Sequence, residues 1–266
     1  MDKKFLLEPR NIEEISLKEL RVLIDYSNRS IIDSIKSRSR LKRNDYIYDK
    51  KAIGKSFSLL DYAIMKKEGY YASIGRYMDS AEFPIKDVKI PEDSPFYGKS
   101  LKNKNFMIKM EVPCLTEFYK GCVIDKFCSN GNNDGMFGQI TDLDVSILEL
   151  INQRINIGRY VAERKIKEDK AEAIKEILKS YNPQKKNMLR KLLSCKQRES
   201  DVLTRTKEYA TGLFVRNQTN PREVKSLENK IENLFSSIIS KTINLEIDHL
   251  VKIAFLNKNT EKNLGI

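Results

Sequence analysis

Apolar side chains recur at intervals of three and four residues through most of the chain, which is the period of an α-helix. The clearest case follows Ser16-Leu-Lys-Glu19, where a serine followed three residues later by a glutamate has the form of a capping box at a helix start. Apolar residues then repeat at helical steps: Leu17, Leu20, Ile24, Ile31 and Ile35. This pattern predicts a long first helix with one buried face.

The same period predicts further helices over about residues 56–78, 105–125, 141–181, 184–214 and 221–257. Pro113 is expected to break or kink the second of these, and Asn182-Pro183 to end the third. Alternating strand patterns are short, and no internal repeat is present. A chain of 266 residues is long enough to bury a sizeable core. We therefore expect one all-α domain over residues 1–266, folded as a multi-helix bundle.

Two stretches interrupt the helical pattern. Pro84, Pro91 and Pro95 predict an extended connection over residues 79–103, because proline cannot continue a regular helix. The run CSNGNNDGMFG, which begins at Cys128, is rich in glycine and asparagine. It predicts a loop over residues 128–141 with left-handed backbone angles.

The chain is strongly basic, with a formal charge of +12. Such a charge suits nucleic acid, an anionic surface or an anionic substrate. The longest basic runs are KSRSRLKRN from Lys36 and KKNMLRKLLSCKQR from Lys185. We interpret the first as the solvated end of the first helix and the second as an amphipathic helix with a wet basic face. Neither carries the interleaved aromatic residues of a single-strand platform, so we expect no nucleic-acid partner.

Common catalytic and metal-binding motifs are missing. The four cysteines (Cys114, Cys122, Cys128 and Cys195) include no CxxC pair, and the only histidine is His249, which we expect to be packed or on the surface. We therefore expect free thiols and no metal site. No nucleophile motif or glycine-rich phosphate loop is present. Without a signal-peptide pattern or a long apolar run, we expect a cytoplasmic protein with no membrane segment.

Three pairs of polar residues lie at spacings that place both members on one helical face. Arg154 and Lys165 are eleven residues apart, about three turns and about 16 Å along a helix, with Gly158 between them. The other pairs are four residues apart: Cys195 with Glu199, and Thr242 with Glu246. Spacing alone leaves two interpretations open, ordinary exposed faces or a pocket for a small dianion.

Five sequence blocks resemble the eukaryotic allosteric chorismate mutases, the all-helical fungal and plant branch of that family. They are LRVLIDYSNRSII, SFSLLDYAI with IGRYM, FGQITDLDVSILELINQRINIGRYVAERK, ESDVLTR and TINLEIDHL. The blocks keep the family's order and span roughly residues 15–255. The long central block is the most specific, because it combines the R-x10-K spacing with an I-x-x-G-[KR]-[FY]-V-A-E core.

The resemblance implies an isomerase, a chorismate mutase that converts chorismate to prephenate in phenylalanine and tyrosine biosynthesis. It also implies which residues form the pocket: Arg21, Arg154, Lys165, Glu199, Thr242 and Glu246. Two further residues are secondary candidates. Cys195 stands where the fungal enzymes carry asparagine, and Arg198 has a counterpart in the short bacterial branch.

The implied reaction is a unimolecular Claisen-type rearrangement, which needs no nucleophile, metal or cofactor. The enzyme must hold a flexible dicarboxylate in its compact form and stabilise charge on the breaking ether oxygen. A planar guanidinium matches a carboxylate, so Arg21 and Arg154 are expected to bind the two carboxylates. Lys165, a point cation, is expected to bind the ether oxygen.

Glu246 must be protonated if it is to donate a hydrogen bond to that same oxygen. This role requires a raised pKa, from burial and from the anionic substrate. Glu199 is expected to accept from the ring hydroxyl, and Thr242 to contact a carboxylate.

The fungal relatives also bind aromatic amino acids at their dimer interface, using two adjacent arginines and a Gly-Ser loop followed by a threonine. The corresponding residues here are Gly75, Arg76, Gly138, Gln139 and Asp142. One arginine is lost and one negative charge is added, so we expect a weak or absent response to tyrosine and tryptophan. The resemblance further implies a homodimer with each active site contained in one chain.

A competing hypothesis keeps the fold and changes the function. In it the chain is a helical scaffold with weakened activity, or a basic nucleic-acid-binding protein, and Cys195 marks the departure from the family. Salt dependence separates the two classes, because binding to nucleic acid weakens steeply as salt rises.

Overall fold

The structure is a computed structural model that describes residues 15–78, 83–86, 88–98, 112–133, 135–167, 171–215 and 220–263. Within these ranges there is no β-strand, only one isolated bridge between Lys42 and Ser129. The predicted all-α class is confirmed. The helices are α1 (Leu17–Ser39), α2 (Leu59–Ser73), α3 (Val112–Tyr119), α4 (Asp125–Phe127), α5 (Phe137–Lys167), α6 (Ala171–Lys179), α7 (Lys186–Leu193), α8 (Lys196–Phe214) and α9 (Pro221–Asn263).

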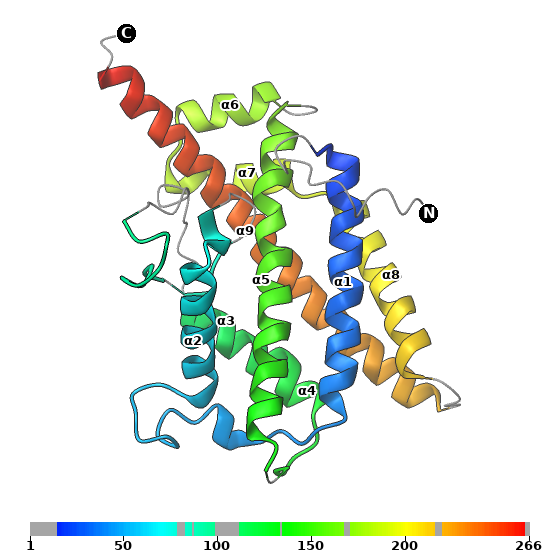
Figure 1. Ribbon diagram of the computed structural model, residues 1–266. Helices are drawn as coiled ribbons and strands as arrows, with labels where there is room; N and C mark the ends of the chain where they lie inside the picture. Colours follow the sequence, from blue (N-terminus) through cyan, green and yellow to red (C-terminus); the bar gives the residue numbers. More distant parts are fainter. Residues whose placement is uncertain are drawn as a thin grey trace.

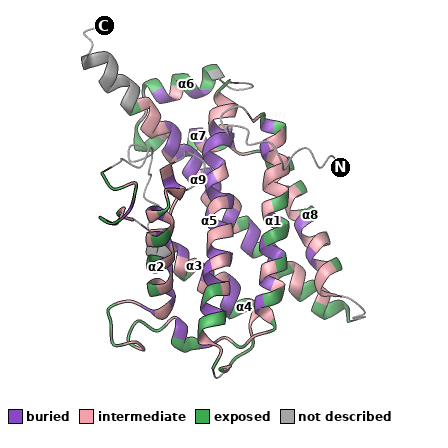
Figure 2. Cartoon of the chain, in the orientation of Figure 1, coloured by how far each residue is buried: buried purple, intermediate pink, exposed green. Residues whose placement is uncertain are grey.

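Helix α5 lies at the centre of the molecule, between α1 and α2 (Figure 1). Helix α9 crosses α5, and α8 packs against both α1 and α9. Buried positions gather on the faces that these helices turn toward one another (Figure 2). The main core includes Ile35 of α1, Ile151 and Ile155 of α5, and Phe235 of α9. None of the helices among the described residues is long and apolar enough to cross a membrane.

Capping boxes determine where the first two helices begin. The Ser16 hydroxyl accepts from the Glu19 N–H at 3.3 Å, and the Ser16 N–H donates to the Glu19 carboxylate at 2.9 Å. This confirms the predicted start of α1. Ser58 and Asp61 make the same reciprocal pair at the start of α2, three residues later than expected. Helix α2 also ends early, at Ser73, because the chain turns at Gly75 with φ of +80°.

The prediction of one helix over residues 184–214 is wrong. Helix α7 ends at Leu193 and α8 begins at Lys196, with Ser194 and Cys195 in extended conformation between them. No proline or glycine marks this break. Its cause is tertiary, because Lys165 of α5 donates to the Leu193 carbonyl at 2.6 Å.

Other boundaries differ by smaller amounts. The predicted 128–141 loop ends at residue 136, so Gly138 and Gln139 lie in the first turn of α5. Met136 and Phe137 pack on the main core, and this packing outweighs the roughly 1 kcal/mol that a helical glycine costs. The predicted 141–181 helix is two helices, α5 and α6.

The proline-rich part of the chain agrees in outline with the sequence. Residues 83–86 and 88–98 of the expected 79–103 connection contain no helix, and residues 99–111 lie outside the described ranges. The predicted 105–125 helix is described from Val112 and contains a π-helical turn over Lys120–Ile124. Pro113 stands in its first turn, where a missing N–H costs no helical hydrogen bond.

The interpretation of the run from Lys36 as a solvated helix end is wrong for Arg38. This side chain is fully buried, and its Nε donates to Asp144 of α5 at 2.6 Å. The hydroxyls of Tyr48 and Tyr119 each donate to the same carboxylate at 2.6 Å. The remaining guanidinium nitrogens donate to backbone carbonyls just after α1. This buried pair therefore joins α1, α5 and the segment that follows α1.

Candidate active site

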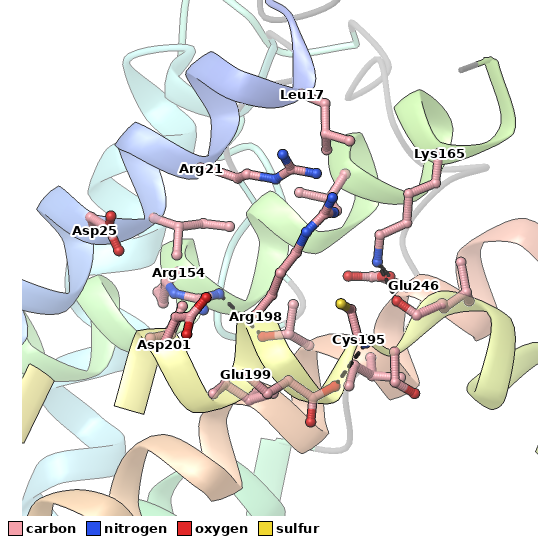
Figure 3. Close-up of a pocket in the computed structure, with 18 of the residues that line it drawn as sticks. Leu17, Arg21, Asp25, Arg154, Lys165, Cys195, Arg198, Glu199, Asp201 and Glu246 are labelled. Atoms are coloured by element: carbon pink, nitrogen blue, oxygen red, sulfur yellow. Dashed lines mark hydrogen bonds and ion pairs between the residues drawn. The ribbon is translucent and has the colours of Figure 1, made fainter. Parts of the chain in front are cut away.

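A cavity of about 470 Å³ lies between α1, α5, α9 and the junction of α7 with α8. Its walls include all eight residues that the sequence predicted for the pocket: Arg21, Arg154, Lys165, Cys195, Arg198, Glu199, Thr242 and Glu246. Figure 3 shows the side chains of Arg21 and Arg198 entering this cavity from α1 and α8. The structure thus brings together residues from four helices.

Arg154 lies at the bottom of the cavity and is only 3% exposed. Its Nε donates to the Asn28 side-chain oxygen at 2.9 Å, and its Nη1 donates to the Thr242 hydroxyl at 3.3 Å. Both of these partners are neutral. Burial lowers the pKa of Arg154 to about 10, so the group stays protonated at neutral pH. A buried cation held by neutral groups provides a strong attraction for an anion in the cavity.

Lys165 and Glu246 form an ion pair on the cavity wall, with Nζ and Oε2 2.8 Å apart. The carboxylate is 3% exposed, and burial raises the pKa of Glu246 above its ordinary range while Lys165 and Arg154 oppose that shift. Glu246 therefore takes up a proton more readily than a surface glutamate does. The direction of this shift is the one that the resemblance implied.

The break between α7 and α8 places Cys195 at the start of α8 with its thiol exposed. The Cys195 backbone N–H donates to the Glu199 carboxylate at 3.2 Å. A carboxylate has about four acceptor positions, so Glu199 can still accept from a ligand hydroxyl. The backbone at position 195, rather than the thiol, thus makes the contact that orients Glu199.

The charge on the cavity wall favours an anionic ligand. Five cations line it: Arg21, Arg154, Lys165, Arg198 and Arg205. Four carboxylates line it as well: Asp25, Glu199, Asp201 and Glu246. When Glu246 is protonated, five cations face three carboxylates, and the net charge of +2 balances a dianion.

The sequence argument missed several of these residues. Asp25 and Asn28 lie four and seven residues after Arg21, so helical periodicity already placed all three on one face of α1. Arg205, which pairs with Asp25 at 3.1 Å, is likewise about two turns from Arg198 on α8 and so lies on the same face. The Leu193 carbonyl bound by Lys165 had no signal in the sequence, because it becomes available only where α7 ends.

The end of α2 has no room for a side chain at Gly75. A methyl group there would lie 2.8 Å from the Phe96 ring, and the positive φ also favours glycine. The adjacent Arg76 stacks on the Tyr71 ring, with its guanidinium carbon 4.0 Å from the ring centre. Phe96 therefore fills the space beside Gly75.

The five residues at the expected effector positions do not meet within one chain. Gly138, Gln139 and Asp142 lie in the first two turns of α5. Arg76 lines a small hollow with Gln153 of the same helix. Gln153 is fifteen residues beyond Gly138, which is about 22 Å along the helix.

His249 is packed in the interior, which is one of the two positions expected for it from the sequence. The ring is 3% exposed, and its Nε2 lies 2.7 Å from the Glu163 carboxylate. This contact joins α5 and α9 and is separate from the residues that line the cavity.

Comparison with known proteins identifies chains of similar sequence and fold. The family model described as chorismate mutase type II matches residues 136–247, from α5 into α9. The cytosolic chorismate mutase 2 of Zea mays is 26% identical over 211 residues, which cover 74% of this chain and 77% of the maize protein. The Schizosaccharomyces pombe chorismate mutase is 27% identical over 162 residues, which cover 58% of this chain and 63% of that protein.

Among solved structures, the Candida albicans chorismate mutase in complex with L-Trp has a TM-score of 0.74 to this chain. The match covers 94% of each chain at 21% identity, and a likeness at that identity concerns the fold. The fold, the matched segment and the named relatives agree. The chain is similar to the all-helical eukaryotic chorismate mutases, in sequence over residues 136–247 and in fold over 94% of its length.

Proposed function

We propose that the cavity binds chorismate and rearranges it to prephenate, a step toward phenylalanine and tyrosine. The observation that carries this proposal is the buried Arg154 and the Lys165–Glu246 pair facing one cavity. In the reaction, the ether C–O bond of the enolpyruvyl group breaks as a C–C bond forms. Atoms, protons and electrons balance within one molecule, so the protein only has to position the substrate and stabilise charge.

Arg154 binds one substrate carboxylate in this mechanism, and Arg21 binds the other. A guanidinium has five N–H donors, and the contacts to Asn28 and Thr242 occupy two of the Arg154 nitrogens while fixing its plane. Such a fixed guanidinium holds the substrate without reorganising when it binds. The Thr242 hydroxyl lies beside it and donates to the Ile238 carbonyl at 2.8 Å. In this mechanism that proton turns from the carbonyl to the same carboxylate when the substrate binds.

Lys165 and protonated Glu246 donate to the ether oxygen, on which negative charge grows as the C–O bond breaks. Their existing contact at 2.8 Å places both donors at one point of the wall. Glu199 accepts from the ring hydroxyl. Arg198, which is exposed at the mouth, is a secondary contact for a carboxylate.

The direct test is conversion of chorismate by the purified protein, followed by NMR of substrate and product. We expect Arg154→Ala to lower kcat/KM by about 100-fold or more, the usual cost of one preorganised donor. Arg222→Ala, which removes an exposed cation at the start of α9, is the matched control and should leave the rate unchanged. Absence of turnover, together with salt-sensitive binding of RNA or DNA, would instead support the competing basic-scaffold hypothesis.

We also propose a homodimer whose two active sites are each formed by one chain. The eight residues predicted for the pocket meet in one cavity of a single chain, without a contribution from a second copy, which supports a self-contained site. Sedimentation velocity gives the assembly state. A monomer that retains full activity would exclude the dimer without affecting the proposed reaction.

Regulation by aromatic amino acids is expected to be weak. The Candida albicans neighbour was solved with L-Trp, but here Phe96 fills the space beside Gly75, and Asp142 adds negative charge. Clear activation by tryptophan or inhibition by tyrosine in an initial-rate assay would contradict this expectation.

We also propose that the protein is located in the cytosol, because the maize relative is named as cytosolic. Imaging of a tagged chain would test that location.

A further inference from the structure

Helix α9 crosses α5 (Figure 1), and Gly158 of α5 packs directly against α9. A methyl group at this position would lie 2.6 Å from the Thr242 methyl carbon, 3.2 Å from the Thr242 carbonyl oxygen and 3.4 Å from Glu246 Cγ. Carbon atoms in contact are normally 3.5–4.0 Å apart, so an alanine here requires the helices to separate by about 1 Å. One turn further along, Ala162 is fully buried in a cluster with Ile243 and Ile247 of α9. Small residues thus line this crossing.

Gly158 also lies on the face of α5 that carries both catalytic candidates of that helix. Arg154 precedes it by four residues and Lys165 follows it by seven, which keeps all three on one side. Each of these cations contacts a residue of α9. Arg154 donates to Thr242 at 3.3 Å, and Lys165 contacts Glu246 at 2.8 Å. The two residues of α9 that meet the cations are the two that a Cβ at position 158 would touch.

We propose that Gly158 is a positioning residue for the rearrangement, because its missing side chain lets α5 and α9 approach until both polar pairs form. This inference rests on the proposed function. Gly158 has no contact of its own with a ligand and acts through Thr242 and Glu246. Its helical propensity is about 1 kcal/mol poorer than that of alanine, so a glycine in the buried middle of a 31-residue helix lowers local stability. The close approach accounts for its presence there.

The test is a double-mutant cycle between positions 158 and 242. Gly158→Ala introduces the methyl group, and Thr242→Ser removes the methyl carbon that lies 2.6 Å away while keeping the hydroxyl that Arg154 binds. We expect Gly158→Ala alone to lower kcat by about 100-fold with a small change in KM, as a displacement of about 1 Å in an active site does. In the Thr242→Ser background the same change should cost about tenfold or less, because only the longer contacts remain, to the carbonyl oxygen at 3.2 Å and to Glu246 Cγ at 3.4 Å. Gly212→Ala, at a helical glycine with open space around it, is the matched control.

Thermal unfolding of each variant separates positioning from folding. A purely structural role would lower the melting temperature of Gly158→Ala while leaving kcat per folded molecule at the wild-type value, and that result would overturn the proposal. A folded Gly158→Ala variant with wild-type kcat, or an equal loss in both backgrounds, would overturn it as well. If Gly158→Ala alone does not fold, kcat of the folded double variant is compared with kcat of Thr242→Ser. A kcat about 100-fold lower in the double variant would show that removing the Thr242 methyl does not relieve the effect, and would overturn the proposal. Wild-type protein without turnover would instead refute the proposed function itself.

Discussion

Replacing Glu246 with glutamine tests the protonation state on which the mechanism depends. Glu246 is 3% exposed, and burial raises the pKa of its carboxyl although Lys165 lies 2.8 Å away. The protonated form donates to the ether oxygen, so activity is present below this pKa and is lost as pH rises through it. Above the pKa, kcat/KM of the wild type should fall about tenfold per pH unit, or about 1.4 kcal/mol of transition-state stabilisation.

Glu246→Gln carries an N–H₂ donor at every pH, and its oxygen still accepts from Lys165. We therefore expect a flat profile across the range in which the wild type declines, measured as kcat/KM for chorismate between about pH 5 and pH 9. Glu176→Gln on exposed α6 is the matched control and should keep the wild-type profile. A Glu246→Gln variant that folds and still shows the wild-type high-pH decline would refute the role of this proton.

Protein stability provides an independent measurement of the same group. Because the folded pKa of Glu246 is raised, the native state holds a proton that the unfolded state releases above its ordinary pKa, about 4.3. The free energy of unfolding therefore falls as pH rises from that value to the folded pKa. Above the folded pKa this loss of stability is complete and changes no further. Glu246→Gln removes this dependence, so the variant should gain stability relative to the wild type as pH rises. Urea unfolding at several pH values would show whether it does.

Three further predictions follow from buried groups outside the cavity. Asp144→Ala should lower the free energy of unfolding by about 3–5 kcal/mol in urea denaturation, because it leaves Arg38 buried without its carboxylate. Gly75→Ala should lower it by about 1–3 kcal/mol through a strained positive φ, and adding Phe96→Ala should recover only the part due to the ring contact. Burial raises the pKa of Glu68 to about 7, so stability should fall as pH rises toward 7, and Glu68→Gln should flatten that dependence in thermal melts.

Local signals were sufficient where a helix end depends on neighbouring residues. Ser16 and Glu19 satisfy each other's backbone partners, and the start of α1 was predicted correctly from four letters. The break at Ser194–Cys195 was not predictable in this way. It depends on Lys165, which is 28 residues away from Leu193 in the chain and binds its carbonyl. The helical propensities of residues Leu192–Lys196 do not indicate that contact, so they do not predict the break.

The burial of charged side chains was the second feature that could not be predicted from the sequence. Arg38 stands in a basic run, and the spacing of Arg154 left an ordinary exposed face open, yet the two residues are 0% and 3% exposed. What distinguishes them is a partner on another helix, Asp144 for Arg38 and the Asn28–Thr242 pair for Arg154. Periodicity gives the face on which a residue lies but not what that face meets. The prediction of a pocket therefore depended on the family resemblance rather than on spacing.

The two buried arginines also show how a structural charge differs from a functional one. Arg38 is neutralised by the Asp144 carboxylate, which two tyrosine hydroxyls hold in place, so its desolvation is offset within the protein. Arg154 is held by an amide oxygen and a hydroxyl, which orient it but do not neutralise it. Burial lowers the pKa of Arg154 to about 10, although Glu246 and Asp25 oppose that shift, while Asp144 raises the pKa of Arg38 against the effect of burial. A buried cation with only neutral hydrogen-bond partners lowers the stability of the ligand-free protein. A bound anion supplies the negative charge that offsets this cost. The dianionic substrate is therefore the partner that completes the site at Arg154, as Asp144 does at Arg38.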